Sequence, residues 1–453
     1  MDSNITTKSQ TNEDKLEMRK ILPVFLIILI DLLGLTIIIP LLPLYAASFG
    51  GSAGVIGLLG AAYPTMQVIG APILGRLSDR FGRKPILLIS QAGTLLGFLL
   101  LGFANSLTLL FISRMLDGLS GANISTAQAV ISDSTSQKNR TRGLGLVGAA
   151  FGLGFVIGPV IAFISLSLGE NNFHIPAFIA AGFSLISIFL TAVLLKETRP
   201  AANQVRLSSR KEITFSLLLE TLKKPLVGFL LLVIFLQQIA FGSFQQLLSL
   251  FTLSRLGLNA SGNAIIFVFV GIVVVSVQGY FIGKLSRRFG EIWLIRFGLV
   301  MLVAGLLLTS LTPRIPPPWY SRQEVSQELS GSRALPGETP PTQNLQIELP
   351  SDANKGYAGL IWILVAMIPA AIGGGVLQPS INSLLTRNVS PLEVGGTLGI
   401  SAALLSAANA FAPLFGGQLF QIVSDGAPYW VGAILAGILF LFSIRGLKEP
   451  EAK

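Results

Sequence analysis

The sequence predicts an all-α membrane protein, with twelve transmembrane helices arranged as two pseudo-symmetric six-helix bundles. Composition, the lengths of the apolar runs and an internal repeat predict this fold class. Of 453 residues, 51% are apolar and 12% are charged, and the charged share is about half that of a typical soluble domain. With a mean hydropathy of +0.71, a soluble protein would expose large apolar patches to water. The composition therefore indicates a chain surrounded by lipid and excludes an intrinsically disordered one.

Twelve apolar runs approach or exceed the roughly 20 residues that a helix needs to cross a bilayer. The first six runs are 21–45, 54–75, 85–104, 106–131, 143–168 and 174–195. The second six are 225–252, 261–283, 292–312, 358–386, 394–423 and 427–446. Glycines and prolines within these runs can be tolerated, because neighbouring helices satisfy the backbone groups that they free.

Polar segments divide the chain into parts. The predicted parts are an N-terminal tail over 1–20, a bundle over 21–195, a linker over 196–224, a second bundle over 225–446 and a C-terminal tail over 447–453. The second bundle contains an insertion over 313–357, which begins with a proline-rich stretch and continues with Ser, Gln, Glu and Pro. This composition predicts an extended or disordered linker, and a binding or sorting role is the alternative.

The placement of basic residues predicts the orientation. Of 32 Lys and Arg residues, 25 fall on one side of the twelve spans and five on the other, with two inside spans. Basic residues are enriched on the cytoplasmic side of membrane proteins. We therefore expect a multi-pass protein of the plasma (inner) membrane, with both termini and the 196–224 linker in the cytoplasm.

The two halves repeat a motif. Residues 75–82 read Gly-Arg-Leu-Ser-Asp-Arg-Phe-Gly and residues 283–290 read Gly-Lys-Leu-Ser-Arg-Arg-Phe-Gly, an offset of 208. Further matches at an offset of 254 are Gly145 with Gly399, Gln128 with Asn382, and Pro159 with Pro413. The offset changes by 46, close to the 45 residues of the insertion. Such a repeat predicts two parallel six-helix halves, as in transporters that rock two bundles about a central site.

The first-half motif carries charges at a spacing that suits a conformational latch. Asp79 lies among cations at the expected membrane edge, where ion pairs can form and break as helices slide. Gly75 permits close helix approach and Gly82 permits a tight turn. The predicted latch residues are Gly75, Asp79, Arg80, Gly82 and Arg83. The second-half copy has Arg287 at the position of the acid, which argues against a symmetric latch. Residues 75–85 resemble the signature loop of the major facilitator superfamily.

Three ionisable residues fall inside predicted spans: Asp31, Arg114 and Asp117. At 1.5 Å per residue, they lie about 12–16 Å from one end of their helices, where a charge costs at least ~2.5–3.5 kcal/mol. Arg114 and Asp117 are three residues apart and share a helix face. We expect a paired cluster at a wet pocket, whose protonation is coupled to conformation. The alternatives are an Arg–Asp pair that only holds two helices together and an Asp31 that is merely a satisfied polar residue.

Glycines and prolines in two other spans predict close packing and bending of helices. Small residues four apart let helices approach, and proline bends a helix. These residues are Gly148, Gly152, Gly154, Gly158 and Pro159 in the fifth span and Pro413 in the eleventh. The fifth-span stretch resembles the antiporter motif of the same superfamily, and packing alone is the alternative.

Uncharged polar residues within spans predict a roomy, weakly selective substrate pocket. The candidate pocket residues are Asn123, Gln237, Gln238, Gln245, Gln278, Gln378 and Asn382. Hydrogen bonds between helices explain any one of them equally well. The single histidine, His174, lies in a short predicted outer loop and is expected to be solvated.

The chain has no cysteine and one histidine. These counts exclude a disulfide framework, an iron–sulfur cluster, a thiolate metal site and a multi-histidine metal centre. Neither a nucleophile–base pair nor an ATP-binding loop is visible in the sequence, so an enzyme is disfavoured and no cofactor is expected.

Residues 31–43, 75–85 and 114–123 together resemble the drug:proton antiporter branch of the major facilitator superfamily, and in particular tetracycline efflux proteins. The resemblance implies a monomer that exports small amphipathic compounds by alternating access, with the proton gradient as its energy source and Arg114 in proton transfer. Its partners would be the substrate, protons and the lipid bilayer, without nucleic acid. The ninth span, 292–312, has no acid, although tetracycline exporters carry one there, so another apolar or cationic cargo is as compatible. A facilitator or importer of a sugar, metabolite or siderophore, a channel, and a membrane-embedded enzyme are the alternatives.

Overall fold

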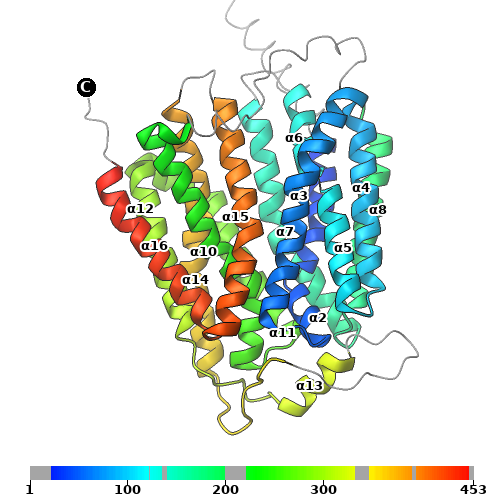
Figure 1. Cartoon of the computed structure of the whole chain (residues 1–453), viewed down its shortest axis with the longest axis vertical. Coiled ribbons are helices and arrows are strands. Elements are labelled where there is room, and N and C mark those ends of the chain that lie inside the picture. Colours follow the sequence, from blue (N-terminus) through cyan, green and yellow to red (C-terminus); the bar gives the residue numbers. More distant parts are fainter. Residues whose placement is uncertain are drawn as a thin grey trace, which may run out of the picture.

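The computed structural model describes residues 22–121, 123–134, 140–198, 221–331, 346–389 and 394–447. Within these ranges the regular structure is helical, and the long helices run side by side between two opposite ends of the molecule (Figure 1). The all-α fold class predicted from the sequence is therefore confirmed. The predicted tails, most of the 196–224 linker and part of the insertion lie outside the described residues.

The first half of the chain forms one bundle. A first helix over 22–38 is interrupted at 39–41, next to Pro40, and resumes as α2 (Leu42–Ser48). The further helices are α3 (Ala53–Phe81), α4 (Arg83–Gly102), α5 (Leu107–Ser120), α6 (Asn123–Ser134), α7 (Arg140–Leu168) and α8 (His174–Leu194).

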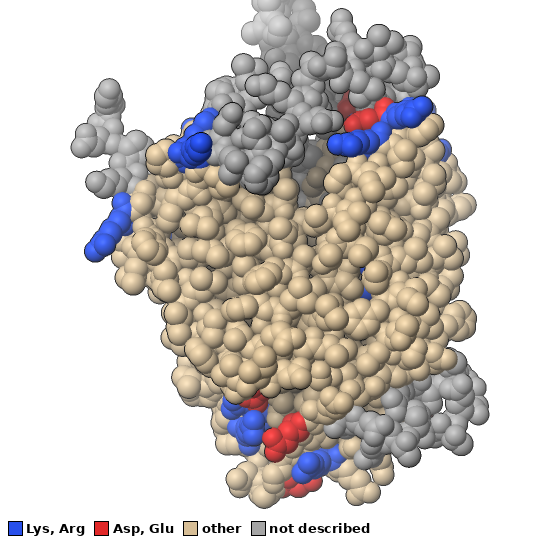
Figure 2. Space-filling view, in the orientation of Figure 1, with Lys and Arg blue, Asp and Glu red and all other residues tan. Residues whose placement is uncertain are grey.

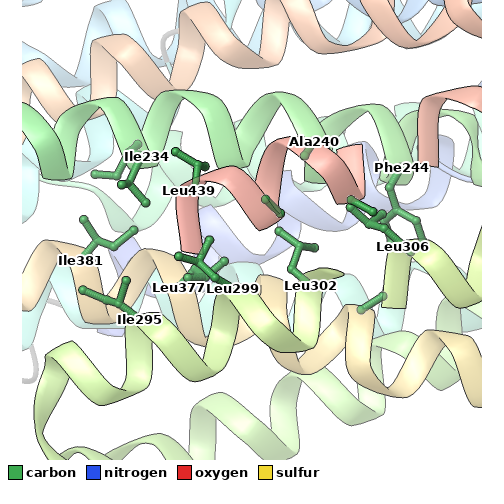
Figure 3. Close-up of a cluster of buried hydrophobic side chains, with 14 of the residues drawn as sticks. Ile234, Ala240, Phe244, Ile295, Leu299, Leu302, Leu306, Leu377, Ile381 and Leu439 are labelled. Carbon is green, nitrogen blue, oxygen red and sulfur yellow. The ribbon is translucent and has the colours of Figure 1, made fainter. Parts of the chain in front are cut away.

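The second half forms the other bundle. Its elements are α10 (Pro225–Leu256), α11 (Ala260–Ser276), the π-helix η2 (Val277–Phe281), α12 (Ile282–Ser310), α13 (Arg322–Gly331), α14 (Ala358–Arg387), α15 (Val394–Ile422) and α16 (Ala427–Gly446). Its core lies between α10, α12, α14 and α16, where Ile234, Leu299, Leu377 and Leu439 meet (Figure 3).

Ten stretches of the described residues are long and apolar enough to cross a membrane. One of them, Ala260–Ser310, has 51 residues, which as a straight helix would be about twice the thickness of the hydrocarbon core. It breaks at Gly290, whose φ of 79° and ψ of 167° are not helical. In addition, α5 and α6 are separated around Gly121, so neither alone reaches the length of a span. All twelve predicted runs therefore lie on helices in the described part of the chain.

Two segments predicted as loops are mostly helical. We expected a loop after the second span, but α3 continues to Phe81 and α4 begins at Arg83, with only Gly82 between them. Likewise 284–291 is helical on both sides of Gly290. Gly82 has a φ of 104° and Gly290 a φ of 79°, and this conformation, which favours glycine, turns the chain within one residue.

The insertion is not simply extended. Residues 322–331 form α13, and the side chains of Tyr320, Val325 and Leu329 are buried in one cluster with Leu42 of α2 and Leu253 of α10. Apolar side chains spaced three to five residues apart give the short helix a face that can bury against both halves. We call this end of the molecule the α13 end.

His174 is buried rather than solvated, with 3% of its surface exposed. Its Nδ1 lies 2.8 Å from the Gly102 carbonyl oxygen and 3.1 Å from the Tyr45 hydroxyl. These partners remove the penalty of burying the ring nitrogen.

Charged side chains gather at the two ends of the molecule, and the broad belt between them shows almost no charge on the face drawn in Figure 2. We call the end opposite α13 the basic end, because Arg76, Arg80, Arg83 and Lys84 lie there, at the junction of α3 and α4. The belt suits a lipid environment, since a bilayer core excludes charge. The protein is a multi-pass membrane protein.

The two bundles pack on each other through α3 with α15 and α7 with α11. At the α13 end the contact is tight, because a side chain at Gly57 would clash with the Pro413 carbonyl and the Gly417 backbone. Hydrogen bonds from Ser52 to Gln421 and from Ser249 to the Pro40 carbonyl join the halves there. Towards the basic end, a Cβ at Gly75 or Gly279 would meet nothing within 4 Å. The halves are thus closed at the α13 end.

Candidate functional site

The structure brings the three predicted ionisable residues into one cluster in the first bundle. Arg114 and Asp117 lie on one face of α5, with Arg114 Nη1 3.2 Å from Asp117 Oδ2. Only 2% and 3% of these side chains are exposed. Asp31, on the first helix, lines a cavity together with Asp117. The expected clustering is present, and its role in proton coupling stays a prediction.

The cavity is small and is built from four helices. Its lining residues are Asp31, Leu32 and Leu35 of the first helix, Tyr63 of α3, Thr94 and Phe98 of α4, and Asp117 and Gly121 at the end of α5. Its volume is about 20 Å³, which is enough for about one water molecule. A cavity of this size suits the movement of a proton and excludes a drug-sized compound.

Arg114 has more hydrogen-bonding capacity than its neighbours use. Its Nε and Nη2 atoms are buried and have no hydrogen-bond partner among the described residues. Phe98 lies beneath the guanidinium, with Arg114 Cζ 5.4 Å from the ring centroid, and Thr94 donates a hydrogen bond to Asp117. Buried donors without acceptors cost about 1–3 kcal/mol each. These two donors therefore favour a water molecule in the cavity, or a different side-chain conformation of one of the two aspartates, as their acceptor.

Tyr63 is a site residue that sequence reasoning missed. It lines the cavity beside both acids, and Gln67 Nε2 donates to its hydroxyl over 3.2 Å. The backbone of Tyr63 packs directly on Gly118, where a side chain would clash. A tyrosine inside an apolar span needs a polar partner for its hydroxyl. This requirement was the feature of the sequence that could have identified Tyr63 as a site residue.

Two of the predicted latch residues, Asp79 and Arg83, form an ion pair, and their role as a latch stays a prediction. Arg83 Nη2 lies 2.8 Å from Asp79 Oδ1, its Nε 3.0 Å from Asp133 Oδ2, and its Nη1 donates to Ser78 Oγ over 2.7 Å. Only 5% of the Arg83 side chain is exposed. Arg83, at the start of α4, is thus tied to both α3 and the end of α6. By contrast, Arg80 lies over the exposed Phe81 ring.

Glu197 is a second residue that sequence reasoning missed, since it falls in the predicted linker. Its carboxylate accepts hydrogen bonds from the backbone amides of Arg83 and Lys84, at 2.9 and 3.1 Å. Gly82, which precedes α4, has no side chain to cap the helix. A carboxylate at a helix N-terminus satisfies free amides and interacts favourably with the helix dipole. Glu197 therefore caps the N-terminus of α4 at the turn formed by Gly82.

Comparison with known proteins decides the family. Residues 24–321, about two thirds of the chain, match the sequence profile of the Major Facilitator Superfamily. The chain belongs to the major facilitator superfamily. It is therefore a membrane transporter and not an enzyme.

This major facilitator chain has relatives along its whole length. It is 28% identical to the tetracycline resistance protein of class H from Pasteurella multocida, covering 93% of this chain and 95% of the relative. It is 27% identical to multidrug resistance protein 1 of Bacillus subtilis (strain 168), covering 90% and 91%. In fold it is similar to the human organic anion transporter MFSD10 (TETRAN), with a TM-score of 0.64, 21% identity and coverage of 94% and 99%. The nucleoside transporter NupG gives a TM-score of 0.65 at 13% identity, covering 95% and 99%.

The fifth-span glycines of the transporter pack on two different helices. Gly154 and Gly158 face Thr36 of the first helix, and at Gly158 a side chain would clash. Gly152 faces α11 of the other half, where its Cβ would lie 3.8 Å from Val275. The side-chain environment of Gly148 lies outside the described residues. Small residues on α7 thus allow both close packing within the first bundle and contact between bundles.

Three of the predicted pocket residues make hydrogen bonds between helices of the second bundle. Gln238 Nε2 donates to Asn409 over 2.7 Å, Ser401 donates to Asn382 over 3.1 Å, and Gln278 Nε2 donates to the Gly375 carbonyl over 3.2 Å. Gln237 is 3.5 Å from Gln238, Gln245 and Gln378 are half-buried, and the Asn123 side chain is outside the described residues. These hydrogen bonds join the side chains to protein groups, and substrate contact by these residues stays a prediction.

Proposed function

We propose that the protein is a secondary active transporter that exports small amphipathic, drug-like compounds in exchange for protons, by alternating access. The observation that carries the proposal is the buried cluster of Asp31, Arg114 and Asp117 around a water-sized cavity. Ionisable groups within a membrane bundle are costly to bury, and those that occur there mark ion pathways, proton relays or substrate sites.

Charge counting gives the cluster one exchangeable proton. Two carboxylates and one guanidinium carry one excess negative charge when both acids are ionised. In a low-dielectric interior that excess charge is expensive, and binding one proton removes it. A conformation that wets the cavity from one side favours release, and a dry one favours the protonated form. Proton occupancy and conformation are thereby coupled.

The orientation assigns the two ends of the molecule to the two compartments. We propose that the basic end faces the cytoplasm, because most Lys and Arg residues lie on segments of that side. The conformation closed at the α13 end is then the one that loads cargo from the cytoplasm. Because the proton cavity is too small for a drug, cargo would bind between the two halves. The relatives named for tetracycline and multidrug resistance support a drug-like cargo.

Asp31→Asn tests the proposal, because it removes the titrating group while keeping the shape of the side chain. In inside-out membrane vesicles with an imposed proton gradient, the unmodified protein should accumulate tetracycline or the lipophilic cation ethidium. The variant should lose at least about 90% of this uptake. Asp352→Asn, on a half-exposed carboxylate of the insertion, is the matched control and should keep it. Full uptake by a folded Asp31→Asn protein would show that Asp31 takes no part in coupling. Accumulation of the compound inside right-side-out vesicles would show that the protein is an importer.

A further inference from the structure

The insertion that follows α12 is fixed to its own half at the turn between α10 and α11. The Tyr320 ring lies against Gly257, where a Cβ would clash with it, and the Tyr320 hydroxyl donates to the Pro350 carbonyl over 2.9 Å. On α13, the Glu328 carboxylate accepts hydrogen bonds from Asn259 Nδ2 at 3.0 and 3.2 Å. Asn259 is also the N-cap of α11. The residue before α13 and α13 itself are therefore both anchored to the α10–α11 turn of the second half.

The same helix packs on the first half. Figure 1 shows α13 lying across this end of the molecule next to α2, and the two helices are in contact. Val325 and Leu329, one turn apart on α13, are 8% and 1% exposed. They are buried in one cluster with Leu44 and Tyr45 of α2. Because α2 also contacts α10, two separate elements of the second half hold this part of the first.

The length of α13 suits a contact that forms and breaks. It has 10 residues, and a helix of this length is only marginally stable in water without tertiary contacts. Its helical form therefore depends on its packing against α2 and on the bond from Asn259 to Glu328. A segment with so few buried side chains can detach at a low free-energy cost, while the long helices keep their structure.

We propose that residues 320–331 form a strap, which ties α2 of the first half to the second half and so favours the conformation closed at the α13 end. The strap is anchored on the second half, whereas α2 belongs to the first. Parting of the halves at this end therefore requires α13 to release α2. The inference goes beyond the proposed function, because it concerns the conformational equilibrium and not the cargo or the proton.

A single introduced cysteine can report opening at the α13 end, because the chain has no cysteine of its own. Ser249 of α10 is 1% exposed, and its hydroxyl donates to the Pro40 carbonyl of the first half over 2.7 Å. The thiol of Ser249→Cys should therefore react with N-ethylmaleimide only when the halves part at this end. The alkylation rate of the full-length protein in detergent, without cargo, then follows the fraction of open molecules.

Substitutions on the buried face of α13 should raise this rate. Leu329→Ala removes a buried apolar group that would be exposed once α13 leaves α2, so it weakens the closed state and should raise the rate at least about tenfold. Val325→Ala removes a smaller group from the same face and should raise the rate by a smaller factor. Leu311→Ala makes the same change as Leu329→Ala at a leucine that is 65% exposed, just after α12, and should leave the rate unchanged.

A second reporter separates opening from general unfolding. Ser443 of α16 is 0% exposed and lies near the basic end, so alkylation of Ser443→Cys should be equally slow with and without Leu329→Ala. An unchanged Ser249→Cys rate in both α13 variants would overturn the strap. An equal rise in Leu311→Ala, or at the Ser443→Cys reporter, would also overturn it. Because no transport is measured, these outcomes do not depend on the proposed export.

Discussion

Buried charged residues determine which substitutions the first bundle can tolerate without losing stability. Arg114 is the cation of a cluster with two acids, and its surroundings are apolar apart from Thr94 and Tyr63. Removing one partner of a buried ion pair is more harmful than removing both, because an uncompensated charge remains. Stability and transport can therefore be separated at this pair.

We expect Arg114→Met to lower the free energy of unfolding by about 3–5 kcal/mol, since it leaves Asp117 buried without its cation. Arg114→Met combined with Asp117→Leu should recover most of that loss but remain inactive in proton-driven uptake. Thermal unfolding in detergent and vesicle uptake measure the two effects. A double variant that transports normally would show that the pair only holds helices together.

The site residues that the sequence revealed are those whose chemistry conflicts with their surroundings. Asp31, Arg114 and Asp117 stand out because a charge in an apolar run demands an explanation. Tyr63 and Glu197 do not stand out, since a tyrosine is half apolar and a glutamate in a polar linker is ordinary. Their importance arises only when folding brings them to the cavity or to the start of α4. His174 was placed wrongly for the same reason, because its partners are distant in sequence.

At the scale of elements, two glycines decide where helices turn. The apolar runs were located correctly, but the α3–α4 connection and the 284–291 segment were expected as loops. The turns are shorter because Gly82 and Gly290 adopt a positive φ. Hydropathy reports the middle of a span, whereas its ends depend on single backbone angles, which an apolar pattern does not encode. The helical α13 was missed because its composition is polar and its apolar face is short.

Alanine at these two turns should be destabilising to different degrees. A non-glycine residue in this backbone region costs about 1–3 kcal/mol. A methyl group at Gly290 meets nothing within 4 Å, whereas at Gly82 it would lie 2.6 Å from the Glu197 carboxylate and disturb the cap of α4. Both variants should lower the thermal midpoint, and Gly82→Ala should lower it more. Gly182→Ala, in open space within α8, is the control and should be neutral or slightly stabilising. An equal fall in the thermal midpoint for the Gly82 and Gly290 variants would show that the Glu197 cap does not contribute to stability.

At the scale of the whole molecule, the repeat predicted two similar halves, and these halves are closed at one end. The sequence could not predict which end, because alternating access requires the same chain to close at either. That choice depends on small differences between contacts across the two halves, such as Gly57 against Pro413 at the α13 end. The state and the orientation together determine which compartment reaches the site.

The orientation can be measured directly, because the chain has no cysteine of its own. A cysteine can be introduced at either end, as Gln323→Cys on α13 or as Arg445→Cys at the basic end of α16. Both residues are exposed. If the basic end is cytoplasmic, as the distribution of Lys and Arg predicts, a membrane-impermeant maleimide should label the first variant in intact cells. It should label the second only after the membrane is permeabilised. The reverse pattern would place the α13 end in the cytoplasm, and this conformation would then be closed towards the cytoplasm.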